Sequence, residues 1–253
     1  MTHGVGILPS RAPAWLAVPA PPTARTANLL RNPAFERTEA LDGAFRRPSD
    51  WQATAFGPHA GAVMAACPAP LAGRRAGRGA SVAWLGDGLP VRTPRRPTAL
   101  YQTLQLEPGA YRFGGRFALR IWDAALDPAT RRVLNASQVF LNAYRGSVAH
   151  DAGARAPAHV DGTLLASIDL SPRRFAFGAF RRPPRGATMV RFAYLGFDTH
   201  DDVFALDEPG PCDVTVQLAV QPVAPPASEG GPLVPLTHVA VLTDHLFVEP
   251  AAC

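Results

Sequence analysis

His200, Asp201 and Asp202 stand next to one another, and imidazole and carboxylate groups transfer protons and bind metals. A polar turn after a strand at Tyr194–Phe197 accounts for the three residues equally well. The sequence contains no Gly-x-Ser-x-Gly elbow, no His-Glu-x-x-His motif and no phosphate-binding loop. Carboxylate pairs that cleave glycosides are recognised by geometry, which a sequence does not give. The sequence therefore predicts a protein that is not an enzyme.

All 25 basic residues are arginines, and the formal net charge is +5. This charge favours acidic partners such as anionic glycans or phosphate-bearing surfaces. Several arginines occur as adjacent pairs beside Pro or Gly, but the pairs are dispersed and no nucleic-acid-binding motif accompanies them. We interpret these pairs as solvated turns and predict no nucleic acid partner.

The three cysteines, Cys67, Cys212 and Cys253, lack metal-ligand spacing. Their odd number leaves at least one free or intermolecular thiol, and whether Cys67 and Cys212 pair is not inferable. The N-terminus has no basic region followed by an uninterrupted apolar run, and Pro and Arg interrupt every apolar stretch. The sequence predicts neither a Sec signal peptide nor membrane insertion.

The elements that position these residues are short and extended. The clearest alternates over residues 111–121, with apolar side chains on one face and arginines on the other, which is typical of a half-buried antiparallel strand. A similar alternation covers Cys212–Val220. Further strands are predicted at Asn28–Glu36, Ala80–Leu85, Thr98–Leu106, Gln138–Arg145, Thr163–Asp169, Arg174–Phe180, Ala187–Phe197 and His238–Val248.

The segments between these strands are rich in Pro, Gly and polar residues. Arg46–Asp50 is predicted to be a turn and Gly146–Gly162 a long loop. Residues 1–26 are predicted to form an extended Pro/Ala-rich arm, because Pro occurs there too often for a core element. With no convincing helix, the class is all-β, a two-sheet sandwich formed as a single domain over residues 27–250.

Five segments resemble, in order, the carbohydrate-binding-module-like (galactose-binding-like) jelly rolls. The first is Asn-Leu-Leu-Arg-Asn-Pro-Ala-Phe-Glu at 28–36, followed by Trp51. The others are Gly79–Trp84, Leu100–Tyr111 with its Gln102 and Pro-Gly turn, Phe180–Phe192, and Thr243–Val248 as the closing strand. The resemblance implies a two-sheet antiparallel jelly-roll sandwich whose opening and closing segments lie together. Residues 123–162 and 221–235 are then long insertions, and Asp201–Leu206 is a second candidate for the closing strand.

The resemblance also implies binding residues. Some relatives bind a structural Ca²⁺ near the opening and closing strands, where Glu36 and Asp244 would be the matching carboxylates. A capped loop without metal is the alternative, and no cofactor is required. Glycan-binding relatives stack sugars on aromatic rings beside polar side chains, and core packing is the alternative for each ring. The candidates are Trp122, Tyr101, Tyr144 and Trp84, with Arg112, Arg116 and Arg120 as polar neighbours.

The expected function is a non-catalytic structural component of a phage-like particle, such as a decoration, fibre or tail-associated part. It would assemble in the cytoplasm and end in a virion or another extracellular particle. Its partners would be itself or other particle proteins, through the N-terminal arm, and surface glycans. A stand-alone glycan-binding module is the alternative, and a polysaccharide-acting enzyme is a more distant one.

Overall fold

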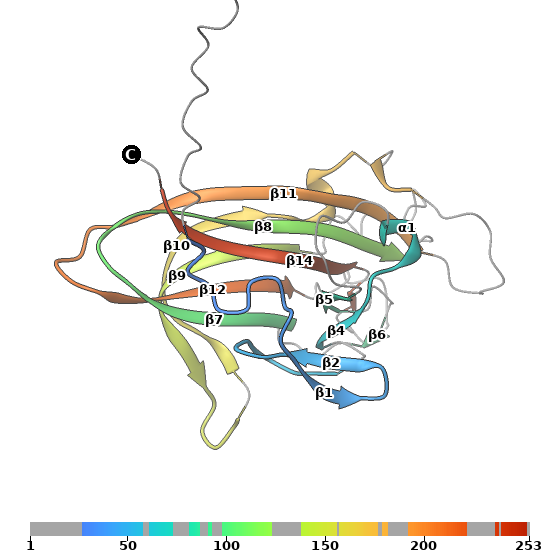
Figure 1. The fold of residues 1–253 in the computed structure, drawn as a ribbon, viewed down its shortest axis with the longest axis horizontal. Helices are drawn as coiled ribbons and strands as arrows, with labels where there is room; N and C mark the ends of the chain where they lie inside the picture. The colour runs from blue at the N-terminus through green and yellow to red at the C-terminus, as the bar shows by residue number, and fades with distance from the viewer. Residues whose placement is uncertain are drawn as a thin grey trace, which may run out of the picture.

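The computed structural model describes residues 27–57, 61–72, 81–86, 91–92, 98–122, 138–155, 157–176, 179–181, 192–221, 236–237 and 239–251. In these ranges strands dominate, and Figure 1 shows them stacked in two layers. The only helical elements described are the four-residue α1 (Ala69–Ala72) and the 3₁₀ turn η3 (Pro172–Arg174). No helix in the described ranges has the length and apolar character that crossing a membrane requires.

The described strands form a seven-stranded sheet, a five-stranded sheet and one small separate pair, β6 (Val91–Arg92) with β13 (Leu236–Thr237). Across the seven-stranded sheet the order is β1 (Thr38–Asp42), β2 (Phe45–Pro48), β4 (Ala62–Ala66), β5 (Ser81–Leu85), β14 (Val239–Pro250), β8 (Gly109–Trp122) and β11 (Phe192–Leu206). Across the five-stranded sheet it is β10 (Pro157–Asp169), β9 (Gln138–His150), β12 (Cys212–Gln221), β7 (Thr98–Leu106) and β3 (Gln52–Ala53).

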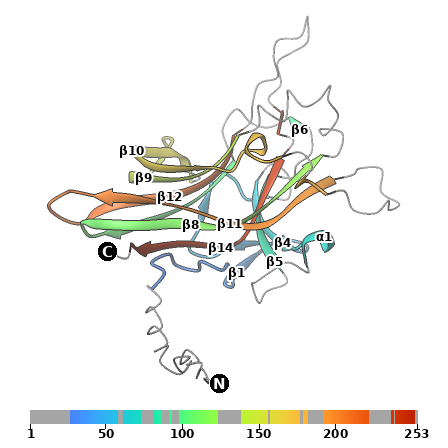
Figure 2. The same cartoon turned by 90° about the horizontal axis from the view of Figure 1, so that it is seen from above.

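The core lies between the two sheets and follows from the alternation of their strands. Tyr111, Phe113, Phe117, Leu119 and Ile121 of β8 are buried in it, and alternate residues of β12 face them from the other sheet. All pairs of named strands are antiparallel, and Figure 2 shows β8, β11 and β14 running side by side. The predicted two-sheet antiparallel jelly-roll sandwich is therefore confirmed.

The opening segment lies against the closing strand, but it is not itself a strand. The side chain of Asn28 stands in for a ladder, accepting from the Val248 N–H (3.1 Å) and donating to the Leu246 carbonyl (2.8 Å). Asn32 has a positive φ of 50° and donates through Nδ2 to the carbonyl of Arg37 (2.8 Å). Two backbone hydrogen bonds also join the segments, from Leu29 N–H to the Val248 carbonyl (2.8 Å) and from Leu246 N–H to the Pro33 carbonyl (3.0 Å). The predicted strand at 28–36 is wrong, because these bonds and the Asn28 side chain do not form a continuous ladder.

A glutamine of the five-stranded sheet also holds the opening segment in place. Gln102 of β7 accepts from the Arg31 N–H (2.6 Å) and donates to the carbonyls of Arg31 (2.9 Å) and Asp50 (3.0 Å). Trp51 donates its indole N–H to the Asn32 carbonyl (3.2 Å). These contacts explain why an Asn-rich opening, a Trp and a buried Gln occur together. The predicted turn at Arg46–Asp50 is shorter than expected, because Arg46 and Arg47 belong to β2.

The long loop predicted at Gly146–Gly162 is instead mostly a hairpin. β9 extends to His150 and β10 begins at Pro157, and the hairpin projects beyond the other strands at the lower left of Figure 1. Gly146 (φ 138°) and Gly162 face each other, and a Cβ on either one would lie 2.1 Å from the other strand's backbone. In the sequence these two glycines indicate a loop. In the structure they allow the backbones of two paired strands to approach closely.

The remaining predictions are resolved where the structure describes them. β14 lies between β5 and β8 beside the opening segment, so the closing strand is the one near the chain end, while Asp201–Leu206 lies on the edge strand β11. Cys67 and Cys212 form no disulfide with each other. The arm at residues 1–26, residues 123–137 of the insertion predicted at 123–162, residues 222–235 of the insertion predicted at 221–235, and Cys253 lie outside the described residues.

Candidate functional site

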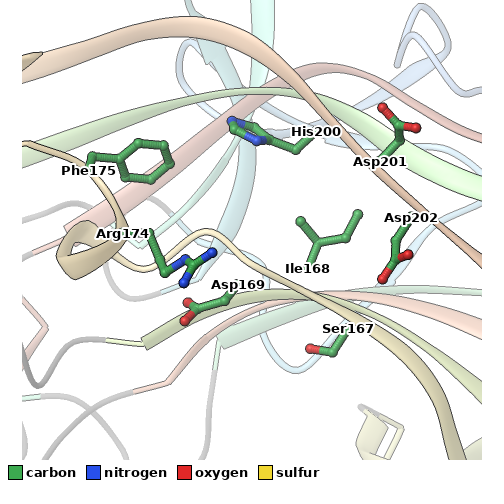
Figure 3. Close-up of a pocket in the computed structure, with 8 residues that line it drawn as sticks. All are labelled: Ser167, Ile168, Asp169, Arg174, Phe175, His200, Asp201 and Asp202. Atoms are coloured by element: carbon green, nitrogen blue, oxygen red, sulfur yellow. The ribbon is translucent and has the colours of Figure 1, made fainter.

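A cavity of about 320 Å³ opens between β10 and β11, the edge strands of the two sheets on the same side of the sandwich. This volume is at the small end of the range for ligand pockets. Figure 3 shows residues from β10 on one side, residues from β11 on the other, and the η3 region at one end. The lining residues are Ser167, Ile168, Asp169, Arg174, Phe175, His200, Asp201 and Asp202.

The end wall of the cavity comes from the turn after β10. Pro172 occupies the start of η3, where its missing N–H leaves no helical hydrogen bond unmade. The N–H of Arg174 donates to the carbonyl of Ser171 (2.9 Å), and the N–H of Phe175 donates to that of Pro172 (3.1 Å). This tight turn places Arg174 and Phe175 beside the cavity. The strand predicted at Arg174–Phe180 is wrong, because Pro172 starts a 3₁₀ turn in its place.

The opposite wall is the middle of β11, where the sequence left open a polar turn. His200, Asp201 and Asp202 are strand residues paired with Gly115, Gly114 and Phe113 of β8, so the turn interpretation is wrong. Strand alternation directs His200 and Asp202 toward the space between the sheets and Asp201 outward. The polar run occurs in a strand because this strand is an edge, where inward side chains meet the cavity instead of the core.

Two of the three lining carboxylates are already paired with arginines outside the cavity. Asp201 accepts from Arg112 (2.8 Å), and this hydrogen bond, opposed by partial burial, holds the pKa of Asp201 below its ordinary value. Burial alone would raise the pKa of Asp169, but hydrogen bonds from Ser171 and from Arg173 (3.0 Å) hold it below its ordinary value. Both groups are therefore ionised near neutral pH.

The other polar groups of the cavity remain available. Neither the Arg174 side chain nor the Asp202 carboxylate makes an ion pair with another described residue, and Asp202 accepts only the N–H of its neighbour Val203 (2.8 Å). The imidazole of His200 meets the Phe175 ring edge to face, with centroids 5.8 Å apart. A cation, a carboxylate and a pair of rings thus share one small opening, a combination that suits a polyhydroxyl ligand.

The carboxylates predicted for Ca²⁺ are not brought together into a cluster of ligands. Asp244 is buried on β14 and its Oδ2 lies 2.7 Å from Nη1 of Arg116, while Glu36 is exposed in the opening segment. Among the described residues no group of three or more His, Cys, Asp or Glu side chains could hold a metal ion. Calcium binding by Glu36 and Asp244 stays a prediction from the resemblance.

The predicted arginines and Trp84 lie together on the outer face of the seven-stranded sheet, where the rings already stack on guanidinium groups. Arg120 lies 4.3 Å from the ring centroid of Trp84 and 4.2 Å from that of Phe192. Arg116 lies 4.9 Å from Phe197, and Arg112 lies 4.9 Å from Phe247. We call Arg112, Arg116 and Arg120, together with the rings that they contact, the arginine ladder. Because arginines cover faces of these rings, Trp84 is better placed for packing than for stacking on a sugar.

The other predicted aromatic residues are distributed elsewhere. Tyr101 is fully buried on the outer face of the five-stranded sheet, packed with Ala99 and Ala219 and covered by Val148 and Val160 of the β9–β10 hairpin. Tyr144, on β9, is half-buried and its hydroxyl accepts from Asn142 (3.2 Å). Burial raises the pKa of both tyrosines. Trp122 ends β8, and its side chain lies outside the described residues.

Sequence reasoning named only the β11 part of the cavity and missed Ser167, Asp169, Arg174 and Phe175. Two signals point to them: Ser171-Pro172 marks a turn at the end of a strand, and a charged residue and an aromatic residue follow it directly. The sequence does not show that β10 and β11 become neighbouring edges. That contact joins segments from different sheets.

No family model and no curated protein matches the chain. Several solved structures are similar, among them the following three. TmCBM61 in complex with β-1,4-galactotriose shares 13% identity over 89% of this chain and 100% of its own, with a TM-score of 0.38. The K1 cleaved adhesin domain of Lys-gingipain from Porphyromonas gingivalis shares 15% identity over 86% and 96%, with a TM-score of 0.40.

The third is the enzymatically active domain of tailspike protein 4 from bacteriophage CBA120. It shares 13% identity over 88% of this chain, with a TM-score of 0.38, and this chain spans only 21% of that one. At these identities and TM-scores the likenesses assign neither a family nor a function. The confirmed resemblance is to the jelly-roll β-sandwich fold. The case for a function rests on the residues of the cavity.

Proposed function

We propose that this protein is a non-catalytic glycan-binding module whose binding site is the cavity between β10 and β11. The observation that carries the proposal is the presence of Arg174 and Asp202, uncommitted to other described side chains, beside the Phe175–His200 pair. Sugar hydroxyls donate and accept hydrogen bonds, so a cation and a carboxylate in one opening bind the same ring. The apolar face of that ring suits the edges and faces of aromatic side chains.

The ionisation of the cavity's carboxylates favours binding over cleavage. A glycoside hydrolase of the common two-carboxylate type needs one carboxylic acid that keeps its proton, which requires a raised pKa. The pKa values of Asp169 and Asp201 are instead lowered, that of Asp169 against its burial by hydrogen bonds from Ser171 and then Arg173, and that of Asp201 by its hydrogen bond from Arg112. We therefore propose that the bound glycan leaves unchanged.

The finer proposal, that the chain is a structural component of a phage-like particle with an extracellular site of action, is supported by the sequence alone. The arm expected to make its assembly contacts, residues 1–26, lies outside the described residues. Deletion of residues 1–26 tests it: we expect loss of a symmetric oligomer, measured by light scattering, with glycan binding retained. A wild-type monomer, or an oligomer unchanged by the deletion, would count against assembly through the arm.

Glycan binding is tested by a glycan array and by affinity-gel retardation with the wild-type protein and four variants. We expect retardation by at least one polysaccharide, and its loss in Arg174→Ala and in Asp202→Ala. Arg155→Ala is the matched control, because Arg155 is an exposed arginine in the turn between β9 and β10, outside the cavity. Trp122→Ala tests the site expected from the sequence.

Several results would contradict the proposal. If Arg155→Ala weakens retardation as much as Arg174→Ala, binding depends on general charge and the cavity is not the site. If Trp122→Ala alone abolishes retardation, the sequence-predicted site is the correct one. Release of new reducing ends from a retarding polysaccharide would show that the protein is an enzyme.

A further inference from the structure

We infer that the cavity between β10 and β11 selects an uncharged sugar, although the chain as a whole is strongly basic; the inference rests on the proposed glycan-binding function. With a net charge of +5, the chain is expected to attract acidic partners. The cavity has a different balance of charge from the surface around it. That local balance, rather than the net charge of the chain, acts on a sugar ring inside the opening.

Each lining carboxylate has one guanidinium counterpart. Asp169 pairs with Arg173 at 3.0 Å, and Asp201 pairs with Arg112 at 2.8 Å. The third carboxylate, Asp202, shares the cavity with the third arginine, Arg174. The three lining carboxylates are therefore matched by three guanidinium groups, and Arg112 also lies 3.9 Å from the carboxylate of Glu249. In Figure 3 Arg174 and Asp202 lie toward opposite ends of it, so both charges stay available to one ligand.

A ligand with a net charge would upset this balance. A uronate carboxylate that bound Arg174 would share the opening with the carboxylate of Asp202, and like charges brought together in a site are unfavourable. An ammonium group on an amino sugar that bound Asp202 would share the opening with the guanidinium group of Arg174. A neutral ring with hydroxyl groups avoids both costs, because one hydroxyl accepts from Arg174 while another donates to Asp202.

The rings of the cavity favour the same class of ligand. Phe175 and His200 offer an apolar edge-to-face pair next to the charged groups. A neutral pyranose has an apolar face of C–H groups and a rim of hydroxyls, so it matches a lining that combines two rings with charged side chains. The ligand class that fits is therefore a neutral hexose or pentose polysaccharide.

Affinity electrophoresis tests the inference with galactan, xyloglucan, mannan and a mixed-linkage glucan. Each is used unmodified and after oxidation of its C6 hydroxymethyl groups to carboxylates, with chitosan as the cationic probe. We expect retardation by at least one unmodified polysaccharide and about tenfold weaker retardation by its carboxylated form, because like charges oppose each other in the site. Raising NaCl from about 50 to about 500 mM should change binding of the unmodified form less than about twofold, since no net charge is paired.

Asp202→Asn gives the sharper test, because it keeps an acceptor of the same shape and removes one negative charge. We expect this variant to bind the carboxylated polysaccharide several-fold more tightly than the wild type does. The ratio of its affinities for the neutral and the carboxylated forms should therefore be smaller. Asp213→Asn is the control, since Asp213 is exposed on β12 and does not line the cavity. It should leave the preference unchanged.

The two proposals fail in different ways. If a carboxylated polysaccharide or chitosan binds as tightly as every neutral one, and Arg174→Ala abolishes that binding, the selectivity is wrong while the cavity is still the binding site. If no polysaccharide, neutral or charged, retards the wild-type protein, the proposed function itself is wrong. An unchanged preference in Asp202→Asn would also overturn the inference.

Discussion

Arg120 of β8 is held between two rings, with centroids 4.3 and 4.2 Å away, whereas Arg174 of η3 makes no side-chain ion pair or ring contact with the described residues. Both arginines lie close to aromatic residues. In the arginine ladder, strand pairing brings each guanidinium over a ring of a neighbouring strand. The faces of these rings are therefore covered by the protein's own arginines. At the cavity a short turn presents the same residue types to an opening. The two sets contain the same residue types, and they differ in whether the guanidinium group already contacts a ring within the protein.

The largest expected effect that tests this comparison is on Arg116, which pairs with the buried Asp244. Arg116→Ala should lower the free energy of unfolding by about 3 kcal/mol, because it takes a guanidinium away from a buried carboxylate. Arg112→Ala is the control: its pairs are exposed, and it should cost about 1 kcal/mol or less. Urea unfolding measures both. Equal losses of unfolding free energy in the two variants would show that burial does not distinguish Arg116 from Arg112.

Arg120→Met should have the next largest effect. Methionine keeps an unbranched apolar stem but loses the charge between Trp84 and Phe192, and two cation–π contacts at these distances contribute about 1–2 kcal/mol together. Urea unfolding gives the loss of stability, and the fluorescence of the folded protein reports the change around Trp84. Retained stability together with lost glycan binding would mean that the ladder, and not the cavity, holds the ligand.

A smaller effect is expected from acid. Because the folded-state pKa of Asp169 is lowered, its ionisation contributes stability that is present above the unfolded value near 3.9 and lost as the pH falls through the folded value. Urea unfolding at about pH 6 and about pH 3 should show a smaller acid-induced loss in Asp169→Asn than in the wild type, by about 1 kcal/mol or less. Asp213→Asn should not reduce the loss, and a reduction of the same size there would remove Asp169 from the explanation.

The smallest effect on stability should come from the residue expected to matter most for binding. Arg174→Ala should change the free energy of unfolding by less than about 0.5 kcal/mol, because the exposed side chain makes no ion pair with the described residues. Thermal unfolding of the variant, measured beside its gel retardation, checks both halves of this statement. A large loss of stability would place Arg174 with the ladder as a structural residue.

The parts of the fold that the sequence predicts well are strands with one face in the core. β7 matches its predicted bounds, and β8 and β12 match closely, because burial of alternate side chains gives a period of two. The opening segment was predicted wrongly as a strand, since the Asn28 side chain makes part of its contact with β14 and the Asn32 side chain bonds locally to the Arg37 carbonyl. Hydrogen bonds made by side chains leave no repeating pattern in the sequence from which they could be predicted.

The cavity was only partly predictable for a related reason. His200, Asp201 and Asp202 stand out as a polar run, but a polar run in a strand is explained only when the strand is known to be an edge facing an opening. Arg174 joins them because the two sheets meet there, and that contact depends on strand order. The stacking of the predicted arginines on the aromatic rings also depends on which strands are neighbours.

The bend of the β9–β10 hairpin has a consequence for how this protein tolerates change. A side chain on Gly146 or Gly162 would collide with backbone atoms of the opposite strand and push the two strands apart. The hairpin would then swing outward, and Ala99, Tyr101 and Ala219 would lose the cover of Val148 and Val160. Residues 151–155 at the tip are exposed and do not pack on the sheet. Substitutions should therefore be tolerated at the tip and destabilising at the two glycines, so new loops can be grafted onto the tip without exposing the sheet beneath.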